Sequence, residues 1–77
     1  MKTRGIQNAI NRLAGARKLG SPALQAQAEQ EGQHILTQAR AWLASTPRPP
    51  AGAEDDRWTP VAQAVEQLAQ ALAGKPA

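Results

Sequence analysis

The chain has 77 residues, no cysteine and a net charge of +3 at neutral pH. This length suffices for one small domain, and the lack of cysteine excludes disulfides and thiolate metal sites as sources of stability. The modest net charge argues against a fully disordered chain. Only 15 side chains are large and apolar, whereas 17 residues are alanine. We therefore expect a homodimer, or another partner, to complete the hydrophobic core.

Residues 3–19 are predicted to form the first helix. Thr3 is a candidate N-cap, and apolar residues follow at spacings of three and four. These apolar residues are Ile6, Ala9, Ile10 and Leu13. At about 100° per residue, Arg4, Arg12 and Lys18 fall on the opposite side of the helix.

A sharp break separates the first helix from the second, which is predicted over residues 22–45. Gly20 suits the left-handed end of a helix, Ser21 suits the next N-cap, and Pro22 suits the first helical position. Gly32 lies on the flank of the apolar stripe, where it either lets another helix approach or is simply tolerated. The stripe consists of Leu24, Ala28, Ile35, Ala39 and Trp42, widened by Leu36 and Leu43.

Residues 46–59 are predicted to be a linker, because three prolines and a glycine interrupt any helix there. A spacer is favoured over a proline-rich ligand for an aromatic groove. The acidic run at residues 54–56 precedes a helix N-terminus, where the helix dipole stabilises negative charge. That role is favoured over a metal site. Proteolysis should concentrate in this linker.

The third helix is predicted over residues 60–73, with Thr59 as its cap and Pro60 at its first position. Gly74 and Pro76 should end it. Its stripe is too short for an independent coiled coil, so it should pack on the second helix, on a symmetry mate or on both. The predicted core and dimer residues are Ile6, Ile10, Leu13, Leu24, Ile35, Leu36, Trp42, Leu43, Val61, Val65, Leu68 and Leu72.

These elements predict an all-α fold in a single domain over residues 1–77. A helical hairpin is followed by a third helix after the proline-rich linker, and the apolar stripes are expected to join two chains in a dimeric helical bundle.

Side chains suited to catalysis are scarce, because the chain has one histidine, six scattered acids and neither cysteine nor tyrosine. Glu31 and His34 have the Glu-x-x-His spacing of di-metal helix bundles. His34 lies off the apolar face, however, and Glu66, the only further carboxylate available on the third helix, faces away from its stripe. We therefore expect no enzymatic activity, no bound metal and no cofactor.

The candidate partner-binding residues are Trp58, Arg4, Arg12 and Lys18. Trp58 belongs to no stripe, so it either folds over the core or anchors a partner, as tryptophans often do at binding sites. The three basic residues could contact phosphates, but a solvated basic face is favoured. The second helix also lacks the basic residues of a DNA-recognition helix until Arg40.

Three features give the chain a resemblance to a known class of proteins. They are its Ala- and Arg-rich composition, the Ser21-Pro22 hairpin and the stripe from Val61 to Leu72. It resembles the small helical accessory proteins of temperate bacteriophages, in particular the helical-hairpin host-takeover proteins of Pseudomonas phages. Those proteins are tiny, cysteine-free and dimeric, and they inhibit host proteins such as a pilus-motor ATPase or a quorum-sensing regulator. The resemblance carries over no functional residue.

Together these features predict a non-enzymatic regulator or inhibitor that docks helices on a host protein. The alternative is a small nucleic-acid-binding or DNA-packaging accessory protein that uses the basic face, and a third is a structural subunit of a phage particle. The sequence contains no apolar run long enough for a membrane span, and a mixed polar helix follows residues 1–4 instead of a signal-peptide core. We expect no membrane association and a cytoplasmic location.

Overall fold

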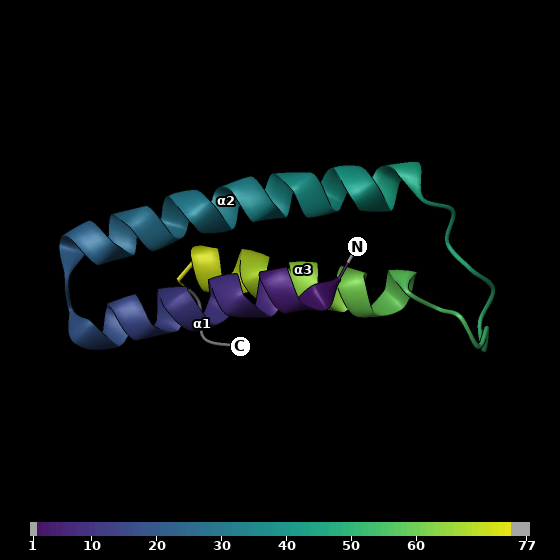
Figure 1. The fold of residues 1–77 in the computed structure, drawn as a ribbon, viewed down its shortest axis with the longest axis horizontal. Helices are drawn as coiled ribbons and strands as arrows, with labels where there is room; N and C mark the ends of the chain where they lie inside the picture. Colours follow the sequence, from purple (N-terminus) through teal and green to yellow (C-terminus); the bar gives the residue numbers. More distant parts are fainter. Residues whose placement is uncertain (1, 75–77) are drawn as a thin grey trace.

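The computed structural model describes residues 2–74, which form three α-helices joined by a turn and a linker (Figure 1). The helices are α1 (Thr3–Leu19), α2 (Pro22–Ser45) and α3 (Trp58–Leu72). α1 and α2 form an antiparallel hairpin, and α3 folds back beside them in the same direction as α1. The molecule is elongated, with extents of 43 × 20 × 18 Å. The predicted all-α fold of a hairpin plus a third helix is confirmed.

The turn between α1 and α2 is formed by the predicted residues. Gly20 adopts a φ of 69°, and its N–H donates to two carbonyl oxygens in the last turn of α1, each at 3.1 Å. The Ser21 hydroxyl accepts a hydrogen bond from the Leu24 N–H at 3.4 Å, and Pro22 is the first residue of α2. A left-handed glycine followed by a serine cap and a proline thus reverses the chain within two residues.

The starts of α1 and α3 differ from the predictions. Thr3 lies inside α1, and Lys2 occupies the N-cap position without a side-chain hydrogen bond. α3 begins at Trp58, two residues before the predicted start, so Thr59 is not its cap. The Asp56 carboxylate instead accepts from the N–H groups of Trp58 and Thr59, at 3.0 and 2.9 Å. Because it satisfies two N–H groups that the first turn leaves unpaired, it allows the helix to begin earlier.

α3 ends at Leu72, one residue before the predicted end. Gly74 has a φ of 74°, and its N–H donates to the Ala71 carbonyl oxygen at 3.2 Å, so it ends the helix as predicted. Pro76 lies outside the described residues. In Figure 1, the end of α3 stops well short of the turn that joins α1 and α2.

The core lies between the three helices, each of which contributes four buried residues. They are Ile6, Ala9, Leu13 and Ala16 of α1; Ala28, Gly32, Leu36 and Ala39 of α2; and Val61, Ala64, Val65 and Leu68 of α3. The residues Ile10, Ile35, Trp42, Leu43 and Leu72 are partly buried against this core. The apolar stripes therefore bury one another within a single chain, which removes the reason to expect dimerisation through them.

Gly32 is buried in the contact between α2 and α3. A Cβ atom placed on it would lie 3.0 Å from Leu72 Cδ2 and 3.6 Å from Leu68 Cδ1. The first of the two interpretations of this glycine is confirmed, because its missing side chain lets α3 approach closely. Elsewhere the small side chain of alanine likewise lets neighbouring helices approach. Alanines make up five of the eleven buried hydrophobic residues in the described chain.

Candidate functional site

A cleft of about 410 Å³ opens between α1 and α2 at the hairpin end of the molecule. This end projects beyond the last turn of α3 (Figure 1). The cleft is lined by Arg12, Gly15, Ala16 and Leu19 of α1 and by Leu24, Gln27, Ala28 and Glu31 of α2. On each helix these residues are spaced by three, one and three positions, so they lie on one side of the helix.

Two leucines stand at the outer end of this cleft. Leu19 is 74% exposed and Leu24 is 45% exposed, and no other large hydrophobic side chain among residues 2–74 is classed as exposed. The prediction that Leu24 belongs to the core is wrong, because α3 ends before it can cover this part of α2. Gly15, Ala16 and Ala28, which have no side chain or a single methyl group, also line the cleft and leave it unfilled.

An ion pair crosses the cleft on the side away from the two leucines. Arg12 Nη1 lies 2.9 Å from Glu31 Oε2, and the side chains remain 66% and 41% exposed. Such an exposed pair contributes at most about 1 kcal/mol to stability. Arg12 therefore leans toward α2, and the prediction that it shares an outward face with Arg4 and Lys18 is wrong. Its position around the helix falls between the outward face and the buried face.

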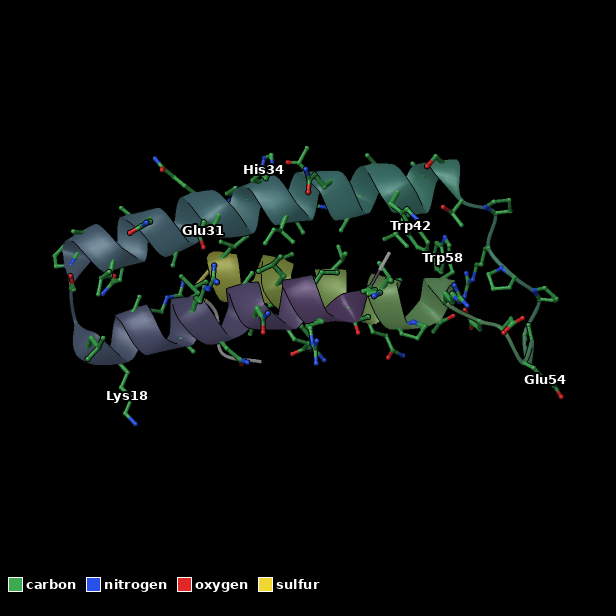
Figure 2. The ribbon with its side chains drawn as sticks, viewed as in Figure 1. Lys18, Glu31, His34, Trp42, Glu54 and Trp58 are labelled. Carbon is green, nitrogen blue, oxygen red and sulfur yellow. The ribbon has the colours of Figure 1, made fainter. Side chains whose placement is uncertain are left out.

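The other two predicted basic residues lie far from each other along α1. Lys18 is exposed near the hairpin turn and points away from α2 (Figure 2). Arg4 lines a second, more open hollow of about 320 Å³ at the starts of α1 and α3, together with Lys2 and Arg57. Asp56 also lines that hollow. The structure thus does not gather the predicted basic residues into one surface.

Trp58 packs at the opposite end of the molecule from the cleft, near Trp42 (Figure 2). Its indole Nε1 donates to the Leu43 carbonyl oxygen at 3.3 Å, and the Arg48 guanidinium carbon lies 5.2 Å from the centre of its ring. It is partly buried. Of its two predicted roles, the structure supports packing at the edge of the core, and the role of partner anchor stays a prediction.

Asp56 is the residue whose ionisation the fold alters most clearly. A side-chain hydrogen bond with Thr59, together with the backbone N–H of the same residue, lowers the pKa of the Asp56 carboxyl group. The N–H of Trp58 and the positive charge of Arg48 act in the same direction. The ionised carboxylate of Asp56 therefore stabilises the start of α3 through these hydrogen bonds.

The Glu-x-x-His pair does not form a shared site. Figure 2 shows Glu31 directed toward α1 and His34 directed away from it. His34 Nε2 lies 3.1 Å from Gln38 Nε2, in an exposed position. Within residues 2–74, no group of three or more histidines and acids lies close enough together to hold a metal ion. No helix in that range is long and apolar enough to cross a membrane.

The chain matches no known protein family, no characterised protein and no solved structure. The geometry of the cleft is therefore the basis for a functional interpretation. Sequence reasoning missed Leu19, although one signal was present: Leu19 and Leu24 stand close on either side of the hairpin turn, Gly20–Ser21. Apolar residues at the tip of a hairpin are reached by a third helix only if that helix is long enough.

Proposed function

We propose that this protein is a small non-enzymatic regulator or inhibitor that docks on another protein through the cleft at its hairpin end. The observation that carries the proposal is the exposure of Leu19 and Leu24 beside small residues that leave the cleft open. Exposed apolar side chains that gather in one place typically mark a protein-binding surface. The Arg12–Glu31 pair on the rim provides polar contacts that can fix the orientation of a partner.

Binding to nucleic acid has less support than docking on a protein. The negative charge of Glu31 beside Arg12 weakens the attraction of this arginine for a phosphate, and Arg4 and Lys18 lie at different ends of α1. Single-stranded nucleic acid would also need exposed aromatic rings for stacking. The indole of Trp58 is instead engaged by Leu43 and Arg48.

The resemblance to host-takeover proteins supports a host protein as the target. Under this proposal the gene belongs to a phage or prophage, and the protein acts in the host cytoplasm. The helices then serve as a rigid scaffold, and the docked cleft blocks a surface that the host protein needs. No catalytic step is required for that effect.

The test is affinity capture from a Pseudomonas lysate with three tagged proteins. The first is the parent chain, the second is Leu19→Glu, and the third is Ala14→Glu, which places the same charge on an exposed position of α1 outside the cleft. We expect the parent and Ala14→Glu to retain the same partner, and Leu19→Glu to lose it. Circular dichroism should show equal helix content in all three.

Nuclease treatment and salt distinguish the nucleic-acid alternative. Capture by an apolar cleft should survive both nuclease and physiological salt. Binding through phosphates should instead weaken steeply with salt, because each neutralised phosphate adds nearly one unit to the slope. If neutralising Arg4 and Lys18 abolished binding while Leu19→Glu had no effect, the nucleic-acid function would replace the one proposed here.

A further inference from the structure

We draw no further inference here: the strongest candidate, the hollow at the starts of α1 and α3 that is lined by Lys2, Arg4 and Arg57, offers only exposed basic side chains beside helix N-termini, and no second observation in the described part of the chain points to a ligand there.

Discussion

Single side chains hold the junction between the linker and the helices. The last four carbonyl groups of a helix have no partner within it, and two of those in α2 are satisfied by side chains. Trp58 donates its indole N–H to the Leu43 carbonyl oxygen, and the Ser45 hydroxyl donates to the Trp42 carbonyl oxygen. The Arg48 guanidinium lies over the Trp58 ring, at a distance typical of a cation–π interaction. The start of α3 is thereby tied to the end of α2.

Replacing Trp58 should therefore lower the free energy of unfolding of the chain itself, whether or not a partner is bound. Trp58→Phe keeps most of the apolar contact and loses one hydrogen bond, so the free energy of unfolding should fall by about 1 kcal/mol. Trp58→Ala also loses the partly buried ring and should cost about 2–3 kcal/mol. Urea titration followed by circular dichroism measures both. Equal stability of Trp58→Ala and the parent would mean that the ring does not hold the junction.

The Asp56 cap should make stability depend on pH. The pKa of Asp56 lies below its ordinary value of 3.8 in the folded chain. A carboxyl group with a lowered folded pKa stabilises the fold above its unfolded pKa, and this contribution is lost as pH falls through the folded pKa. Asp56→Asn, which lacks the charge, should melt at a lower temperature than the parent near neutral pH. The difference should shrink as the pH is lowered below the ordinary value.

Thermal melts between about pH 2.5 and pH 7, on either side of the unperturbed aspartate pKa, measure this effect. Glu54→Gln is the matched control, because Glu54 is exposed in the linker and points away from the helices. Its melting temperature should follow that of the parent at every pH. If the melting temperatures of Asp56→Asn and the parent differed by the same amount at every pH, Asp56 would stabilise the start of α3 by hydrogen bonding alone, without a contribution from its charge.

Among the helices, the boundaries marked by glycine, serine and proline were predictable from sequence. The α1–α2 turn and the end of α3 use residues whose backbone preferences act locally, so spacing and residue type were enough. The start of α3 was missed because Thr59-Pro60 has the pattern of a cap, whereas Asp56 reaches the same N–H groups from further upstream.

The burial of individual residues was harder to predict, because it depends on where the helices meet. Leu24 fits the apolar stripe of α2 as well as Leu36 does, yet only Leu36 is buried. The length of α3 decides the difference, since it ends before Leu24. Gly32 was ambiguous for a related reason: periodicity places it on a flank, and only the path of α3 shows that it is covered. The cleft has the same cause, because α3 is shorter than α2 and ends before it reaches the hairpin end.

Gly15 and Gly32, one in α1 and one in α2, should respond oppositely to substitution. A Cβ on Gly15 meets nothing within 4 Å, so Gly15→Ala should raise the free energy of unfolding by about 0.5–1 kcal/mol through helix propensity. Gly32→Val places a branched side chain against Leu72 and Leu68, and overpacking of this kind costs about 1–3 kcal/mol. Chemical unfolding of both variants tests the contrast. A stabilising Gly32→Val would mean that α3 shifts readily along α2.

At the scale of the whole molecule, the two ends differ in how their side chains are packed. At the linker end, Trp58, Arg48 and Asp56 connect the linker to the helices through specific contacts. The hairpin end instead carries the exposed side chains of Leu19 and Leu24. A domain of this size has a marginal core, since short chains bury a smaller fraction of their surface. A partner that bound only the folded chain at the hairpin end would therefore also stabilise the fold.

The last prediction concerns the linker as the only covalent connection between the hairpin and α3. Residues 50–55 contain one backbone hydrogen bond, from the Ala53 N–H to the Pro50 carbonyl oxygen at 3.2 Å, and their side chains are mostly exposed. A protease of broad specificity should therefore cut first between residues 50 and 55, where little packing restrains the backbone. Mass spectrometry of the early fragments locates the cut. A first cut inside a helix, or slow cleavage of residues 50–55, would show that the linker is better packed than its exposure indicates.

The cleaved protein then reports how strongly the linker holds α3. While intact, a flexible connection of this length keeps α3 at an effective concentration on the order of millimolar beside the hairpin. After cleavage, α3 has only its own contacts, in which Val61, Val65 and Leu68 are its large buried side chains. On dilution to about 10 µM, far below that effective concentration, the cut protein should lose helical signal in circular dichroism while the uncut protein does not. If the cut protein stayed fully helical, the contacts of α3 would be strong enough to hold the bundle without the linker.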